Sequence, residues 1–80
     1  MNERLKHLGR LGEQKLRAEE LRIKMRGIIE SLREHLDPFE RHEELDTELI
    51  ASQAMELGSA KIEYVAVLGE IKAIEKALGR

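Results

Sequence analysis

The sequence contains no cysteine and no tryptophan, and its 80 residues include one proline, one tyrosine and one phenylalanine. The absence of cysteine excludes disulfide bonds and thiolate metal sites, and it suits the reducing environment of the cytoplasm. No apolar run approaches the roughly 20 residues needed to cross a bilayer, and the N-terminal segment lacks the apolar core of a signal peptide. We therefore expect a cytoplasmic protein without a membrane partner.

Charged residues make up 38% of the chain, and Leu, Ile, Ala, Glu, Lys and Arg dominate the composition as a whole. This composition is typical of long helices and coiled coils. A chain of this length forms one domain at most and buries little apolar surface without a partner. We predict an all-α fold, in which residues 1–80 form a single antiparallel two-helix hairpin that resembles a coiled coil.

Two segments carry apolar residues at the spacing of a helix that buries one side. The first covers about residues 3–36 and the second about residues 47–78. Both follow a heptad, abcdefg, with mainly apolar residues at a and d. These positions are Leu11, Gln14, Ala18, Leu21, Met25, Ile28, Leu32 and His35 in the first segment, and Ile50, Gln53, Leu57, Ala60, Tyr64, Val67, Ile71, Ile74 and Leu78 in the second. Gly79 follows as a C-cap glycine.

The turn is expected at about residues 37–46, where Pro38 interrupts the first segment. Proline removes a helical hydrogen bond and disfavours the α conformation of the residue before it. A second helix can begin at Asp37, with Pro38 in its first turn and Glu40 completing a capping box, or it can begin at Asp46. Two conformations stay open, a loop of about ten residues or a tight turn with a short helical lead-in, and we favour the lead-in.

The turn region also gathers two histidines and six carboxylates within residues 34–46. Metal-binding helices present ligands three or four residues apart, whereas His35 and His42 are seven apart with a proline between them. A catalytic residue also needs a concave apolar pocket that shifts its pKa, and a hairpin turn is convex. We expect no catalytic residue, no bound cofactor and no metal site, and we interpret the cluster as a solvated, capped turn.

The g positions of the two segments carry opposite charges. They are Arg10, Arg17 and Lys24 in the first segment and Glu56, Glu63 and Glu70 in the second. Antiparallel coiled coils bring these two rows side by side. The pairs Arg10–Glu70, Arg17–Glu63 and Lys24–Glu56 have residue numbers that add up to 80, which centres the turn on residue 40. The charges and the proline therefore predict the same turn independently.

One heptad step in the packing of the a and d residues stays open. When the numbers of facing residues add up to 78, Gln14 faces Tyr64; when they add up to 85, Leu21 faces Tyr64 and Met25 faces Ala60. The second arrangement fills the volume better, and the first provides Gln14 with a hydrogen-bond partner. The sequence alone does not choose between them.

The second segment carries another apolar row on its other side, which we call the outer stripe. It consists of Ala51, Met55, Gly58, Ile62, Val65, Gly69 and Ala73. A lone hairpin buries one side of each helix, so the outer stripe predicts contact with a further helix. Its burial would contribute several kcal/mol at about 25 cal/mol per Å². We predict a homodimer in which two hairpins form an antiparallel four-helix bundle with the outer stripe at its centre.

The distribution of charge favours stacking the two hairpins in opposite directions. Residues 1–26 carry eight basic and four acidic residues, whereas residues 27–60 carry two basic and nine acidic residues. Each hairpin is therefore basic at its open end and acidic at its turn. Antiparallel stacking places Asp37, Glu40, Glu43 and Glu44 of one chain beside Arg4, Lys6, Lys76 and Arg80 of the other.

The stretch ELIASQAMELGSAKIEYVAVLGEIKAIEKALGR, which follows a basic first helix, resembles the small helical-hairpin proteins encoded in Mu-like prophages. The resemblance covers about the second half of the chain. It implies a bacterial or phage cytoplasmic setting, and it transfers no functional residue.

These features favour a non-enzymatic helical interaction or adaptor protein that self-associates and binds a protein partner through its helix faces. The alternative is a small nucleic-acid-associated regulator that uses the basic residues of the first helix, Arg4, Arg10, Lys15, Arg17, Arg22, Lys24 and Arg26. Those residues flank the apolar row on both sides, and no aromatic residue among them can stack on bases. The net charge is −2, so nucleic acid is the less favoured partner.

Overall fold

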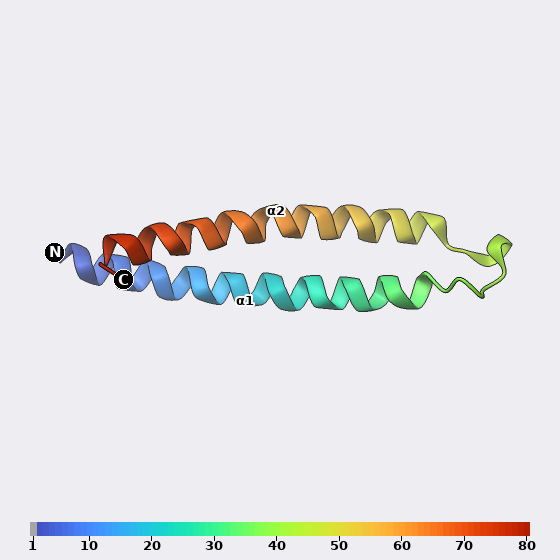
Figure 1. Cartoon of the computed structure of the whole chain (residues 1–80), viewed down its shortest axis with the longest axis horizontal. Coiled ribbons are helices and arrows are strands. Elements are labelled where there is room, and N and C mark those ends of the chain that lie inside the picture. The colour runs from blue at the N-terminus through green and yellow to red at the C-terminus, as the bar shows by residue number, and fades with distance from the viewer. Residues whose placement is uncertain (1) are drawn as a thin grey trace.

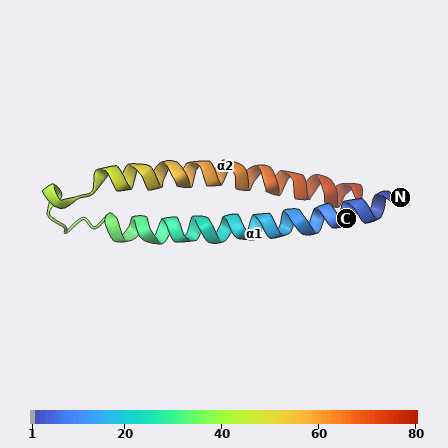
Figure 2. The ribbon, with the colours of Figure 1, turned by 180° about the vertical axis from the view of Figure 1, so that it is seen from behind.

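The computed structural model describes residues 2–80 and consists of two long antiparallel helices (Figure 1). Helix α1 spans Glu3–His35, helix α2 spans Thr47–Ala77, and a short 3₁₀ turn, η1, spans His42–Glu44 between them. The molecule measures 62 × 18 × 14 Å, and the helices lie side by side when it is seen from the front and from behind (Figures 1 and 2). The all-α antiparallel hairpin predicted from the sequence is confirmed.

The ends of the helices are satisfied by local hydrogen bonds. Asn2 Oδ1 accepts from the backbone N–H of Arg4 at 2.9 Å, and Asp46 Oδ1 accepts from that of Leu49 at 3.1 Å. Each bond provides a partner for a backbone donor that the first helical turn leaves free. At the end of α2, Gly79 adopts a positive φ of 79°, and its N–H bonds to the carbonyl of Lys76 at 3.0 Å. Gly79 therefore ends α2 in the way that the sequence predicts.

The core is a narrow seam between the two helices. Its buried residues are Leu11, Leu21 and Ile28 of α1 and Ala60, Val67, Ile74 and Leu78 in and just after α2. Every one of them occupies a predicted a or d position. The hairpin buries one side of α2 in this seam, so apolar residues on the other side, such as Met55 and Ile62, face solvent.

The packing of Leu11 decides the heptad step that the sequence leaves open. Leu11 clusters with Ile74 and Leu78, and Ile71 packs against this group. Leu11 and Ile74 have numbers that add up to 85, whereas the alternative would place Leu11 opposite Val67. Near the turn, Gln53 Nε2 donates to Ser31 Oγ at 2.8 Å, which fits the same arrangement.

The turn corrects one part of the sequence prediction. Asp37 does not cap a helix: its Oδ1 accepts from the N–H of Phe39 at 2.9 Å, and its carbonyl accepts from the N–H of Glu40 at 3.2 Å. Pro38 therefore lies in a β-turn, and Glu40 belongs to that turn rather than to a capping box. The favoured helical lead-in is limited to η1, and α2 begins at Thr47 with Asp46 as its N-cap. A helix through residues 38–45 would have no seam to pack against, and short unpacked helices are marginal in water.

Candidate interaction surfaces

One edge of the hairpin is closed by the two rows of opposite charge. The structure contains all three predicted pairs: Arg10–Glu70 at 3.2 Å, Arg17–Glu63 at 2.6 Å and Lys24–Glu56 at 3.9 Å. Arg17 Nη2 donates to both carboxylate oxygens of Glu63, and this hydrogen bonding raises the pKa of the Arg17 guanidinium above its ordinary value. The side chains of all three pairs are about half exposed, so the pairs select the register more than they add stability.

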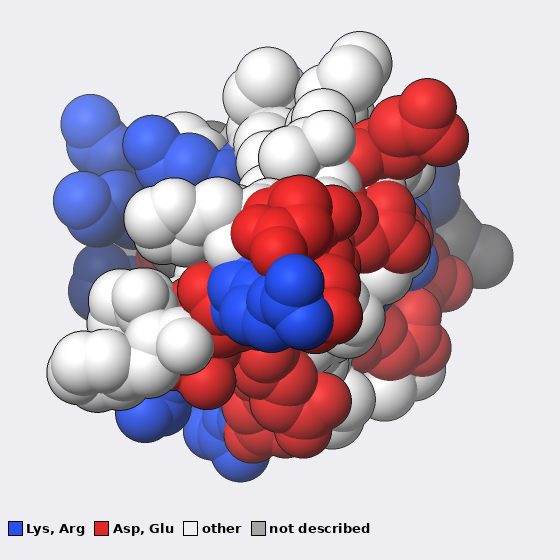
Figure 3. Space-filling model, turned by 90° about the vertical axis from the view of Figure 1, so that its right-hand side faces the viewer, with Lys and Arg blue, Asp and Glu red and all other residues white. Residues whose placement is uncertain are grey.

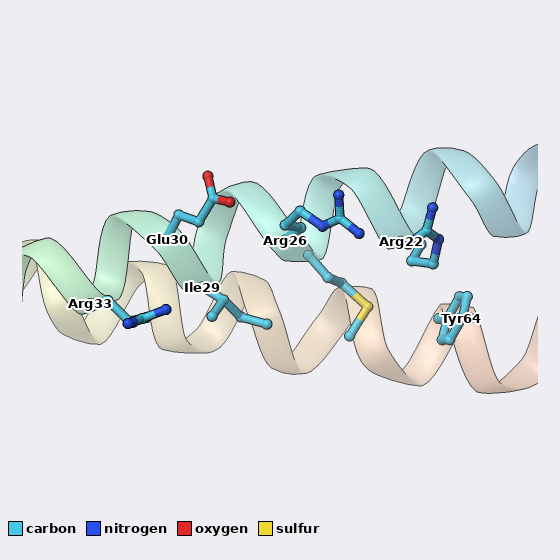
Figure 4. A pocket seen from close by; sticks show the side chains of 7 residues that line it. Arg22, Arg26, Ile29, Glu30, Arg33 and Tyr64 are labelled. Carbon is cyan, nitrogen blue, oxygen red and sulfur yellow. The ribbon is translucent and has the colours of Figure 1, made fainter.

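The other edge of the hairpin carries a shallow groove of about 390 Å³ (Figure 4). Its lining consists of Arg22, Met25, Arg26, Ile29, Glu30, Arg33 and Tyr64. The arginines and Ile29 come from α1, and Tyr64 comes from α2. The groove therefore combines an apolar floor with a rim that is mainly basic.

The three groove arginines differ in their ion pairing within residues 2–80. Arg22 donates to Glu19 through Nη2 at 2.6 Å and through Nε at 3.1 Å; this pairing raises the pKa of Arg22 and lowers that of Glu19. Within residues 2–80, neither Arg26 nor Arg33 forms an ion pair with a carboxylate. Their charges are therefore available to an acidic partner.

The sequence places Arg22 and Arg26 beside the seam as basic residues, but this groove was not predicted from it. The three arginines recur at helical steps of four and seven residues, which places them on one side of α1. That signal was available in the sequence. The contribution of Tyr64 could not be predicted from the sequence, because it depends on the heptad step that only the packed hairpin shows.

The outer stripe of α2 is exposed along its whole length. All seven of its residues are exposed, and the relative exposure of Met55 is 76% and that of Ile62 is 74%. Seen along the long axis, uncharged side chains gather at the top of the molecule, where α2 lies above α1 (Figure 3). The stripe therefore faces away from α1.

A hollow of about 460 Å³ borders the C-terminal half of the outer stripe. Val65, Leu68, Gly69, Ile71, Lys72 and Glu75 line it. A Cβ added at Gly69, or at Gly58 nearer the start of α2, meets no atom within 4 Å. The packing of the hairpin itself therefore requires no glycine at either position.

The two ends of the hairpin differ in charge. Acidic side chains gather at the turn in the end-on view (Figure 3). Arg41 pairs with Glu43 at 2.6 Å and with Glu44 at 3.9 Å, and the pKa of Glu43 is lowered by a backbone hydrogen bond and by Arg41. At the open end, where both termini lie (Figures 1 and 2), Arg4, Lys6, Lys76 and Arg80 are exposed. The predicted polarity is therefore present in the folded chain.

The two histidines of the turn region lie in different environments. His35 Nδ1 lies 2.8 Å from the carbonyl oxygen of Ser31, whereas His42 opens η1. Among residues 2–80, no group of three or more His, Asp or Glu side chains is arranged to hold a metal ion. Neither helix in this part of the chain is both long and apolar enough to cross a membrane.

No protein-family model, curated protein or solved structure matches this chain. The resemblance to prophage hairpin proteins therefore depends on the sequence pattern of α2 alone.

Proposed function

We propose that this chain is a non-enzymatic helical interaction protein of the cytoplasm, of prophage origin, that forms a homodimer and binds a protein partner. In the dimer, the outer stripes of two hairpins meet and the four helices form a bundle with both copies of α2 inside. The observation that carries the proposal is the exposure of Met55, Ile62 and Val65 in one continuous row. Scattered exposed apolar residues are normal on a monomer, but a continuous apolar row is typical of an interface.

The polarity of the hairpin supports opposite directions for the two copies. In that arrangement the acidic turn of each copy lies beside the basic open end of the other, and the attraction adds specificity to the apolar contact. A parallel arrangement would bring two acidic turns together.

The groove on the arginine edge supports the second half of the proposal. A protein segment with carboxylates beside apolar side chains would match the unpaired Arg26 and Arg33 and the apolar floor of Ile29 and Tyr64. Charge complementarity of this kind favours one partner and one orientation. A nucleic acid would use the same two arginines through its phosphates, but the groove offers a single aromatic side chain for stacking.

Sedimentation of the purified chain tests the self-association. We expect a dimer at micromolar concentration, with a midpoint of thermal unfolding that rises with protein concentration. Ile62→Asp places a charge in the centre of the stripe and should give monomeric or unfolded chain. Leu16→Asp makes the same kind of change at an exposed apolar position of α1, outside the stripe; it is the matched control and should leave the dimer intact. A wild-type chain that sediments as a folded monomer at micromolar concentration would refute the proposal.

Paired pull-downs test partner binding. The chain and its Arg26→Glu/Arg33→Glu variant would be compared in a bacterial extract that has been treated with nuclease. A protein retained by the wild type and lost by the variant supports the groove as its site, provided that the variant still forms dimers. Retention of the same proteins by both chains would refute this part of the proposal.

A further inference from the structure

We infer that two copies of α2 pack antiparallel about a two-fold axis at Ile62, in the register that aligns residues whose numbers add up to 124. This inference rests on the self-association proposed above and specifies its geometry. A contact between identical surfaces must be self-complementary when the dimer has two-fold symmetry, since each residue pair occurs twice. The outer stripe meets that requirement in the size and spacing of its residues, and so do the charged residues at its two ends.

The sizes of the stripe residues are complementary in this register. Ile62 meets its own copy, Met55 meets Gly69, and Ala51 meets Ala73. Gly58 meets Ala66, and Val65 meets Ser59. Met55 and Val65 therefore lie opposite smaller residues, and the pairs Gly58–Ala66 and Ala51–Ala73 are small on both sides. Such pairs let two helix backbones approach around Ile62 and let the side chains interdigitate.

The hollow beside Gly69 provides the space for Met55 of the second copy. Gly69 and Val65 line this hollow, and Met55 is 76% exposed with an unbranched, flexible side chain. Glycine in a helix interior carries a cost in stability relative to alanine. The hairpin gives no steric reason for that cost at Gly69, whereas a second helix in this register does.

The charges at the two ends of the stripe complete the match. Glu48 and Lys76 occupy the same side of α2 as Met55, Ile62 and Gly69, since all five are seven residues apart. In the register that adds up to 124, Glu48 of each copy meets Lys76 of the other. Both side chains are exposed, and within residues 2–80 neither forms an ion pair inside the chain. The same register also places the acidic turn beside the basic open end.

Cysteine cross-linking measures the register directly, because the chain has no cysteine of its own. Ile62→Cys should form a disulfide-linked dimer rapidly under mild oxidation. Met55→Cys alone and Gly69→Cys alone should not, because each residue lies about 21 Å along the helix from its own copy and a disulfide needs Cα atoms within about 7 Å. An equimolar mixture of these two variants should give the mixed dimer, identified by its mass.

The outcomes separate this register from self-association in general. If the chain sediments as a dimer but Met55→Cys links to itself, the copies are either parallel or antiparallel in another register. The inferred register is then wrong, although the proposed self-association stands. If the chain is a folded monomer, the proposed function itself fails. Cross-linking of Leu16→Cys, at an exposed position of α1, at the rate of Ile62→Cys would show that the links arise from random collision, and would also overturn the inference.

A pair of glycine variants provides a second measurement that does not depend on oxidation. Gly69→Leu fills the space that Met55 of the second copy would occupy, and overpacking is destabilising. The dimer should therefore dissociate about tenfold more readily, which corresponds to about 1.4 kcal/mol. Gly12→Leu is the matched control, because Gly12 is also exposed and helical with open space around it. An equal effect of both substitutions, or none at Gly69, would contradict the inferred packing.

Discussion

The two apolar sides of α2 contain similar residues and have opposite environments. On the inner side, the relative exposure of Ile74 is 3% and that of Val67 is 8%; on the outer side, that of Ile62 is 74% and that of Val65 is 55%. The difference arises because α1 covers one side of α2 and cannot reach the other. An apolar row at helical spacing therefore predicts that a surface suits burial, but it does not identify what buries it.

The largest difference is expected when one residue on each apolar side of α2 is replaced by aspartate, because the inner side supports folding and the outer side supports association. Ile74→Asp would place an unpaired carboxylate in the seam, where desolvation is severe. We expect loss of most of the helical circular dichroism signal at 25 °C. Ile62→Asp acts on the outer side and should be the less damaging of the two in dilute solution. A stable, fully helical Ile74→Asp variant would show that the seam is not the core.

Truncations on the two sides of α1 should give a smaller version of the same contrast. Leu21→Ala removes a side chain that is 1% exposed and should lower the free energy of unfolding by about 2 to 5 kcal/mol. Leu16→Ala, at an exposed position of the same helix, should change it by no more than about 0.5 kcal/mol. Urea titrations at one fixed protein concentration would measure both. Equal losses would mean that Leu16 is also buried in the protein in solution.

The charge rows beside the inner seam should contribute less than its apolar contacts. Glu63→Lys places two cations together and should lower the melting temperature by a few degrees, and adding Arg17→Glu should restore much of that loss. High salt should reduce the difference between these variants. A double variant as unstable as the two single changes combined would show that the residues do not interact.

The weakest signal is expected for binding of nucleic acid, which would depend on the outward-facing basic residues of the hairpin. Fluorescence anisotropy with a labelled DNA duplex should detect no binding at about 150 mM salt, because few cations lie on any one face and binding through phosphates weakens steeply with salt. An Arg26→Glu/Arg33→Glu variant would serve as the control for any residual signal. Sub-micromolar binding that this variant loses would favour a regulator over an adaptor.

Much of the hairpin could be predicted because its determinants repeat along the chain. The heptad positions identify the residues of the seam, and the rows that contain Arg17 and Glu63 identify the cross-helix pairs. The start of α2 could not be chosen in the same way, since both Asp37 and Asp46 are good capping residues. Asp46 is used because the residues after it pack against α1, whereas those after Asp37 do not.

By itself, the sequence determined the two helices, their antiparallel direction and the three ion pairs, because helix periodicity and charge order are properties of a single chain. The tertiary structure alone decided which layers meet. Two alignments one heptad apart present nearly the same pattern, and the closer fit of Leu11 against Ile74 and Leu78 distinguishes them. It also decided that Tyr64 joins the arginines of α1 in one groove, since that contact joins residues far apart in the chain and depends on the exact alignment of the two helices.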